Sequence, residues 1–366
     1  MMKLCNVLSV TILLSLLPLS VTAQNGEYLA GPPPGDGPLE VLVGFNLVNI
    51  TDVNEKEETI DFEGAIYLEW TDPRLAYDPI DFGMPADWQP GDYSLAPRQI
   101  YQGIYAFSEL YQGWWLSIVI PNGIGNRQIT EQALGVWPDG RVLYHDTFYS
   151  KSETPMDLRL FPFDSQSLEI FFHPFLYGTN EVVLVPDAKL ARTWDQNMGI
   201  ADWSRDSVTI RGRPIRVAKS DGDADEISEV VVTVNIERRP LHFLVSFVFP
   251  MVLLVSLTWC VFWMEKETLS NRVNITFIGI LSVVAYYFVI IDFIPSVSYL
   301  TLMDGFIIST FLILAAGVVL AVVMEEIARK GRFSLGLQLD RVCRWAFPLT
   351  YAITTVVLSV LFFVLY

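Results

Sequence analysis

The sequence predicts two domains of different classes: an extracellular all-β sandwich of the immunoglobulin-like type, followed by an all-α transmembrane domain of four helices. Hydrophobic residues make up 52% of the 366 residues, and long apolar runs gather in the last third. Between residues 40 and 239, short strand-like runs alternate with glycine- and proline-rich turns. A third pattern, that of a secretion signal, precedes both.

Residues 1–23 are interpreted as a signal peptide. Lys3 supplies the basic end, an apolar core follows, and the small residues Val21-Thr22-Ala23 form a cleavage site. The mature chain then begins near Gln24, outside the cytoplasm, and residues 24–39 form an N-terminal linker rich in glycine and proline. An uncleaved anchor helix is the alternative interpretation of the first segment.

Residues 40–239 have the pattern of an extracellular β-sandwich. Two apolar-rich runs joined by a polar connection open it, in VLVGFNLVNITDVNEKEETIDFEGAIYLEW. Turn signals then recur as TDPRL, IPNGIGN, WPDGR, FPFD and IRGRP, and many short strands at such spacing favour a sandwich. The domain holds no cysteine, so its own apolar core must stabilise it.

No catalytic or cofactor-binding pattern appears, so we expect neither an enzyme nor a cofactor. The three histidines, His145, His173 and His242, lack zinc-ligand spacing, and there is no GxSxG, P-loop or GxGxxG motif. The acidic cluster 221–226 lacks the full alternation of a calcium loop and is interpreted as a solvated hairpin tip. We expect no metal site and no nucleic-acid partner.

Four apolar runs predict membrane helices at about 241–263, 269–291, 297–326 and 341–366, within a transmembrane domain of residues 240–366. Each has roughly the 20 residues that cross a bilayer core. Five basic residues against Asp340 place the connection between the third and fourth helices in the cytoplasm. We therefore expect a multi-pass protein of the plasma (inner) membrane, whose large N-terminal domain lies in the periplasm or extracellular space.

Charge is divided unevenly between the two predicted domains. Residues 240–366 contain seven acidic and seven basic side chains, so the net charge of −17 belongs to the part upstream. An acidic domain outside a membrane pore would concentrate cations at its mouth. Ordinary solubility is the alternative explanation of the same charge.

The second apolar run contains a stripe of residues on one helical face. Their spacings of 4, 3, 4, 3 and 4 form a seven-residue repeat. The stripe is polar at its inner end, apolar in the middle and acidic at its outer end, which suits the lining of a pore with an apolar constriction. A seam between packed helices is the alternative. The predicted pore-lining residues are Asn274, Ile278, Leu281, Ala285, Phe288 and Asp292.

Six motifs follow one another in register: WTDPRL, WPDGRVLY, LRLFPFDSQSLEI, RRP, NRVNITFIGILSVVAY and the proline after it. With these motifs, residues 40–366 resemble the pentameric ligand-gated ion channels, the Cys-loop receptor superfamily, and above all its bacterial members. The resemblance implies a homopentamer in the lipid bilayer, with agonist sites between neighbouring extracellular domains. Thr154 and Leu168 stand where the family's paired cysteines would fall, and bacterial members commonly lack that disulfide.

The resemblance also implies a ligand site. Phe175 falls where bacterial relatives carry a ligand-facing aromatic residue, and Asn122 fits a loop eight residues after Trp114. Other family positions lack aromatic residues, which speaks against recognition of an amine by cation–π contacts. Arg216 would favour an anionic ligand or would cap the hairpin 214–227. The candidate set is Phe175, Asn122, Arg216, Val217, Ile227 and Ala65, and the agonist is an unidentified small molecule or protons.

A coupling role is implied for the FPFD turn. By resemblance, Asp164 meets Arg238 just above the first helix, while Phe161 and Phe163 are apolar enough to rest on the outer ends of the helices. The predicted coupling residues are Phe161, Pro162, Phe163, Asp164, Arg238 and Pro295.

The charged residues also predict which ions would permeate. We expect monovalent cations to permeate because of the acidic domain and Asp292, although Asn271 replaces a glutamate often found in bacterial relatives. Modulation by divalent cations stays open. The alternative function is a periplasmic sensor that signals through its membrane helices without conduction, but its cytoplasmic module is missing from the pattern. A membrane enzyme would need a catalytic cluster.

Overall fold

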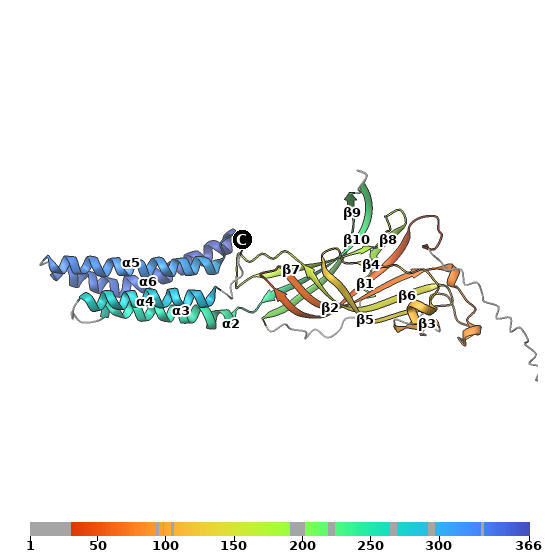
Figure 1. Cartoon of the computed structure of the whole chain (residues 1–366), viewed down its shortest axis with the longest axis horizontal. Coiled ribbons are helices and arrows are strands. Elements are labelled where there is room, and N and C mark those ends of the chain that lie inside the picture. Colours follow the sequence, from red (N-terminus) through yellow and green to blue (C-terminus); the bar gives the residue numbers. More distant parts are fainter. Residues whose placement is uncertain are drawn as a thin grey trace, which may run out of the picture.

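Figure 1 shows the computed structural model of the chain, a long molecule with strands at one end and a helical bundle at the other. The structure describes residues 31–92, 95–97, 99–103, 106–190, 202–218, 224–263, 269–291, 297–330 and 333–366. The expected signal peptide, 1–23, and residues 24–30 of the expected linker lie outside the described residues.

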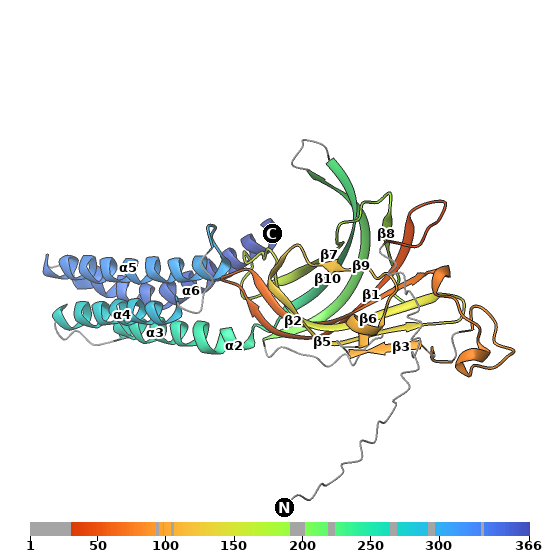
Figure 2. The ribbon, with the colours of Figure 1, turned by 45° about the vertical axis from the view of Figure 1, so that its right-hand side comes forward.

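Two sheets form the strand-rich end (Figure 2). Their order is β3-β5-β6-β2-β1-β8 in one sheet and β4-β7-β10-β9 in the other. The described pairs are antiparallel apart from β1 with β8. The strands are β1 (Leu39–Asn54), β2 (Thr59–Thr71), β3 (Gln99–Gln102), β4 (Ile118–Val119), β5 (Gly123–Val136), β6 (Arg141–Glu153), β7 (Ser165–Pro174), β8 (Val182–Pro186), β9 (Trp203–Ala218) and β10 (Ala224–Arg238). The predicted β-sandwich is confirmed.

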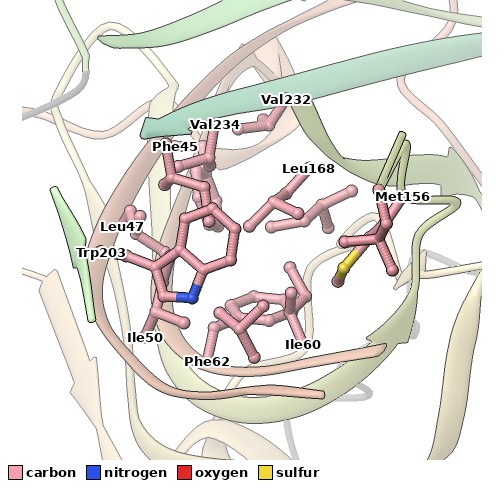
Figure 3. Packing of buried hydrophobic residues seen from close by; sticks show 14 of the residues in the cluster. Phe45, Leu47, Ile50, Ile60, Phe62, Met156, Leu168, Trp203, Val232 and Val234 are labelled. Atoms are coloured by element: carbon pink, nitrogen blue, oxygen red, sulfur yellow. The ribbon is translucent and has the colours of Figure 1, made fainter. Parts of the chain in front are cut away.

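Aromatic and branched side chains fill the space between the sheets (Figure 3). Along β7, side chains alternate between buried and more exposed positions, as expected for a strand with one face on a core. Phe45 of β1 contacts Phe62 of β2 and Phe172 of β7, with ring centroids 6.4 and 5.3 Å apart. Phe45 therefore joins the two sheets, and burial of each such side chain contributes about 1.5–3 kcal/mol.

Two of the sequence motifs pack on each other at the start of β6. In WTDPRL, the Asp72 carboxylate accepts from the backbone and guanidinium of Arg74, and in WPDGRVLY the Gly140 carbonyl accepts from the Asp72 amide at 2.8 Å. Gly140 has a φ of +81°, and a Cβ there would overlap the Asp72 backbone. Asp72 of the first motif and Gly140 of the second are therefore both needed for one close contact between the two loops.

One expected turn, IRGRP, lies within a strand, whereas IPNGIGN forms its turn at residues 120–123, where Gly123 N donates to Ile120 O at 2.9 Å as β5 begins. Residues of IRGRP belong to β9, where Pro214 lies opposite Ser228 of β10. β9 is the edge strand of its sheet, so the missing amide proton of Pro214 removes no ladder bond on the open side. In IPNGIGN, Gly125 adopts a φ of +78° where the pairing of β5 with β6 shifts register, so the glycine marks a bulge.

Four helical segments form the other end of the molecule. The first runs continuously as α2 (Leu241–Phe243), η4 (Leu244–Val248), α3 (Phe249–Trp259) and η5 (Cys260–Trp263). The others are α4 (Leu269–Ile290), α5 (Leu302–Arg329) and α6 (Phe333–Leu365). Compared with the expected ranges, α5 begins and ends later and α6 begins earlier, at Phe333. The polar residues ahead of Trp345 therefore extend α6 beyond its apolar run.

Three helical stretches in the described part are long and apolar enough to cross a membrane: Leu241–Trp263, Leu302–Met324 and Arg341–Leu365. The apolar stretch Asn274–Ile290 of α4 is shorter. α3 contacts α4, α4 contacts α5, and α5 contacts α6. Part of the surface of α4 is therefore packed against α3 and α5.

Candidate functional site

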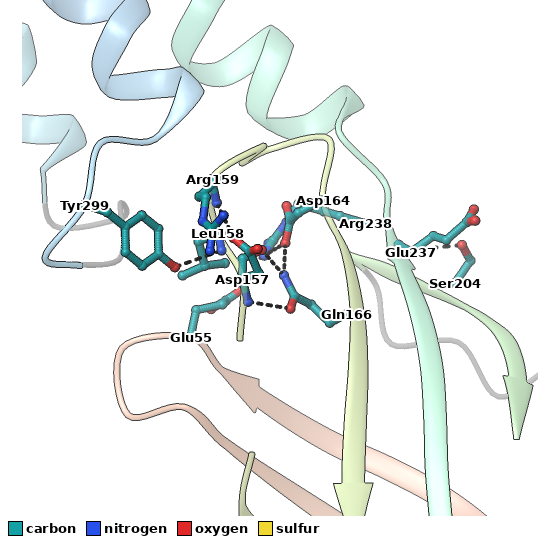
Figure 4. Close-up of polar contacts among 10 residues, drawn as sticks. All are labelled: Glu55, Asp157, Leu158, Arg159, Asp164, Gln166, Ser204, Glu237, Arg238 and Tyr299. Atoms are coloured by element: carbon teal, nitrogen blue, oxygen red, sulfur yellow. Dashed lines mark hydrogen bonds and ion pairs between the residues drawn. The ribbon is translucent and has the colours of Figure 1, made fainter. Parts of the chain in front are cut away.

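The FPFD turn between β6 and β7 lies at the helical end of the sandwich, beside the last residue of β10 (Figure 4). Arg238 Nε donates to Asp164 Oδ1 at 2.7 Å and Nη2 to Oδ2 at 3.3 Å. Both side chains are only 1% exposed. The contact implied by the resemblance is thus present, as a buried pair that is hydrogen-bonded twice.

Two further groups hold Arg238. Its Nη1 donates to Glu55 Oε1 at 2.8 Å, and its guanidinium lies 4.0 Å from the ring of Trp203. Two carboxylates and an aromatic face compensate the loss of water around this charge. Neither Glu55 nor Trp203 is singled out by a local sequence pattern. Glu55 belongs to the acid-rich connection NEKEET, where only the fold distinguishes one carboxylate from the others.

The segment before the turn reaches the helices through the backbone. Leu158 N donates to the Tyr299 hydroxyl at 3.0 Å, and Leu302 N donates to the Arg159 carbonyl at 2.8 Å. The Arg159 guanidinium lies 4.7 Å from the ring of Tyr366 in the last turn of the chain. The β6–β7 connection therefore contacts both the segment ahead of α5 and the end of α6.

The two phenylalanines of the turn contact different helices. Phe161 is buried, with its ring 5.0 Å from that of Phe243, whereas the partly exposed Phe163 lies 6.0 Å from Phe363. Pro162 and Phe163 also line a cavity of about 200 Å³ at the outer end of the bundle. Pro295 lies outside the described residues. The turn therefore rests on the first helical segment and on α6.

The predicted pore stripe faces away from the rest of this chain. Ile278, Leu281 and Phe288 are 62%, 68% and 66% exposed, and Asn274 and Ala285 are also exposed. The opposite side of α4 is buried, through Thr276, Val283 and Ile290. Asp292 lies outside the described residues. Five of the six stripe residues thus share one open face of α4.

Three of the six candidate ligand residues occupy dissimilar environments. Phe175, just after β7, is half exposed. The Asn122 amide donates to the carbonyls of Glu153 and Glu169 and accepts from Phe171 N, so its polar atoms tie strands together. Ala65 is buried in β2. Within this chain, only Phe175 of these three presents a side chain to a ligand.

The remaining three candidates lie in the β9–β10 hairpin. Ile227 pairs with Ile215, and Val217 pairs with Asp225, which puts Val217 and Ile227 on one face of the sheet. Arg216 pairs with Glu226, so strand alternation puts it on the other face. The hairpin tip, 219–223, lies outside the described residues. Within the described ranges, no group of three or more His, Cys, Asp or Glu side chains could hold a metal ion.

Comparison with known proteins gives the same architecture in the same order. The family model of the neurotransmitter-gated ion-channel ligand binding domain matches residues 27–240, and that of the neurotransmitter-gated ion-channel transmembrane region matches 247–334. The first match ends where β10 ends and the first helix begins.

Individual relatives are distant in sequence. The chain is 24% identical to a proton-gated ion channel of Gloeobacter violaceus over 92% of this chain and 88% of that protein. It is 26% identical to the acetylcholine receptor subunit epsilon of Xenopus laevis, over 82% of this chain and 59% of the subunit. With the gamma-aminobutyric acid receptor subunit pi of Rattus norvegicus, the identity is 24% and the coverage is 73% of this chain and 55% of the subunit. The chain thus spans little more than half the length of these two receptor subunits.

An extracellular β-sandwich joined to membrane-spanning helices, with both domains matched over most of the chain, identifies the protein as a member of the neurotransmitter-gated ion-channel family, the Cys-loop receptors, which are ligand-gated ion channels and not enzymes.

Proposed function

We propose that the chain forms a homopentameric, cation-preferring channel in which α4 lines the pore and a small ligand or protons bind between neighbouring extracellular domains. The open stripe on α4 carries this proposal. In a ring of identical subunits with heterologous contacts, one face of each subunit points to the axis. An exposed apolar face with a polar inner end suits that position, because apolar rings can close a pore by excluding water.

Two observations support the agonist and the selectivity. The Gloeobacter relative is described as a proton-gated ion channel, which favours protons as one agonist. The net charge of −17 lies in the part upstream of the helices, and an acidic surface raises the local concentration of cations.

Planar-bilayer recording of the purified full-length protein tests conduction, while its mass in detergent tests the pentamer. We expect currents that a pH step or a small ligand elicits, and a complex of five copies. A pentamer without current under any ligand or pH would favour the alternative of a sensor that does not conduct. A monomer without current would contradict the channel proposal.

The substitution Leu281→Ser tests the pore face. A hydroxyl at the constriction lets water remain in the closed pore, so we expect larger leak current and opening at lower agonist concentration. Leu312→Ser on α5 is the matched control, because Leu312 is similarly exposed but lies on a different helix. Unchanged gating in Leu281→Ser, or an equal change in both variants, would exclude the stripe as the pore lining.

A further inference from the structure

Three side chains form a row across the four-stranded sheet, next to the candidate ligand residues. Arg213 of β9 and Glu229 of β10 are directly paired, and His173 lies on the neighbouring strand, β7. Arg213 Nε donates to Glu229 Oε1 at 2.6 Å, and His173 Nε2 lies 2.6 Å from Glu229 Oε2. We call this row the Arg213–Glu229–His173 cluster.

Glu229 is the buried centre of the cluster, with a side chain that is 5% exposed. An ionised carboxylate only accepts hydrogen bonds, so His173 Nε2 must carry a proton to make its contact with Glu229. The charge of the imidazole then depends on its second ring nitrogen. Imidazole is the side chain whose charge ordinarily changes between about pH 5 and 8. One proton therefore decides whether the cluster is neutral or carries one positive charge.

The described charged side chains that share a face of the sheet with His173 lie on β7, β9 and β10. On the same face of the sheet, β10 contributes Glu229 and β9 contributes Arg213, with Arg211 one row away. β4 places Val119 opposite His173. Asp225 and Glu169 lie on this face two rows away, toward the hairpin tip and toward the helices respectively. Glu229 is thus the carboxylate that meets the imidazole directly.

The position of the cluster links it to the candidate ligand site. His173 precedes Phe175 by two residues, and Glu229 follows Ile227 by two residues, so both candidates continue the strands that carry the cluster. The cluster lies beside Val230 and Phe172, where the pairing of β10 with β7 ends, and toward the hairpin tip the next pair on this face is Ile215 with Ile227. A change in the attraction between β7 and β10 therefore acts on the spacing between Phe175 and the hairpin.

We infer that the Arg213–Glu229–His173 cluster is a proton-binding site that regulates the candidate ligand site, an inference that rests on the proposed channel function. A proton taken up by neutral His173 turns its hydrogen bond to the Glu229 carboxylate into an ion pair, so the two side chains attract each other more strongly. Acid then holds β7 against β10, and neutral pH weakens this contact between the two strands. The proton adds to a ring nitrogen, and no other bond changes.

The experiment uses the full-length protein and two readouts across pH 5 to 8. His173→Gln keeps an N–H donor for Glu229 but cannot change its charge in this range. Glu229→Gln removes the anion and keeps an acceptor. His145→Gln is the matched control, because His145 lies on β6 of the other sheet. Melting temperature in detergent reports the site itself, and current across a bilayer reports its effect on opening.

We expect His173→Gln and Glu229→Gln to lose a pH-dependent change in melting temperature and in current that the wild type and His145→Gln retain. Wild-type pH dependence in His173→Gln, or equal losses in His145→Gln, would overturn the inference. If neither the wild type nor any variant conducts, but the pH-dependent change in melting temperature is lost in His173→Gln alone among the histidine variants, the proton site stands and the proposed channel function fails.

Discussion

At the scale of single residues, Arg238 shows how the fold accommodates a buried charge at the junction of sandwich and helices. Asp164 and Glu55 bind it from two sides, and the ring of Trp203 covers its face. Removing one partner of a buried pair leaves the other charge poorly compensated, which costs more than the pair itself contributes. The junction is therefore sensitive to loss of either carboxylate.

Asp164→Asn is expected to uncouple ligand or proton binding from opening. The amide keeps one acceptor but loses its charge, so the contact weakens by about 2–3 kcal/mol. We expect opening to require more agonist while the amount of pentamer stays near wild type. Asp157→Asn, an exposed acid of the same connection that pairs with Arg159, is the control. Normal currents in Asp164→Asn at normal expression would refute this coupling role.

Asp146 is a second buried carboxylate, inside the sandwich. It accepts from Tyr144 at 2.8 Å and from Arg127 at 3.0 Å. Burial raises the pKa of Asp146, and the charge of Arg127 and the bond from Tyr144 offset that effect only in part. The folded chain thus keeps a proton at pH values where the unfolded chain has lost it, so this stabilisation is complete below the unfolded pKa and is lost as pH rises through the folded one.

Asp146→Asn is neutral at every pH, so it is expected to remove the pH-dependent contribution of Asp146 to the stability of the fold. Relative to wild type, its melting temperature should rise as pH increases from about 4 toward neutrality, because the wild type alone loses its bound proton. Differential scanning fluorimetry across that range measures the difference between the two curves. Parallel curves would show that Asp146 ionises as it does in the unfolded chain.

At the scale of elements, the contact between α3 and α4 depends on a small residue. A Cβ on Gly279 of α4 would overlap the Thr258 hydroxyl of α3, whose Oγ1 donates to Leu254 O at 2.9 Å. The proposed pore stripe lies on the same helix. The orientation of that stripe is therefore tied to how closely α4 can approach α3.

Gly279→Ala is expected to destabilise the helical domain by about 1–3 kcal/mol, because overpacking forces the two helices apart. Gly305→Ala on α5 is the control, since its Cβ would meet Phe362 at an ordinary 3.5 Å. There we expect a neutral or slightly stabilising effect from the better helix former. Thr258→Ala should restore the melting temperature of Gly279→Ala, and failure to do so would place the strain elsewhere.

At the scale of the whole molecule, one group of contacting buried hydrophobic residues extends from Val41 in the sandwich to Tyr351 in α6. Phe161 and Phe243 belong to its junction, where their rings are 5.0 Å apart. The two domains thus share packed surface as well as the ion pair of Arg238. A movement of the sandwich can therefore be transmitted to the helices through contacting side chains.

Charge acts at the same scale, and it predicts a salt effect. The proposed cation preference rests partly on the acidic upstream domain, whose field is screened within about 10 Å at 0.1 M salt and about 3 Å at 1 M. We expect reversal potentials in KCl gradients to show a stronger preference for K⁺ at the lower salt concentration. A preference that does not change with salt would assign selectivity to the pore itself.

Much of the architecture followed from local patterns. Turn signals and strand-like runs predicted the sandwich, and the spacing of Leu281 with its neighbours predicted one shared face of α4. These predictions succeed because strand alternation and helical periodicity depend on residues close in sequence. The turn predicted at IRGRP was wrong. Proline fits within a strand that lies at the edge of a sheet, and whether a strand lies at an edge depends on contacts between residues far apart in the sequence.

The sequence by itself determined the two-domain class, the membrane helices and the stripe on α4. Tertiary structure alone decided that Glu55 joins Asp164 at Arg238, why Asn122 bonds to strands, and that His173 and Glu229 lie within hydrogen-bond distance. Residues 173 and 229 come together only through the pairing of β7 with β10. Hydrogen bonds and ion pairs act within a few ångströms, so partners far apart in the chain become specific only when the sheets and helices have packed.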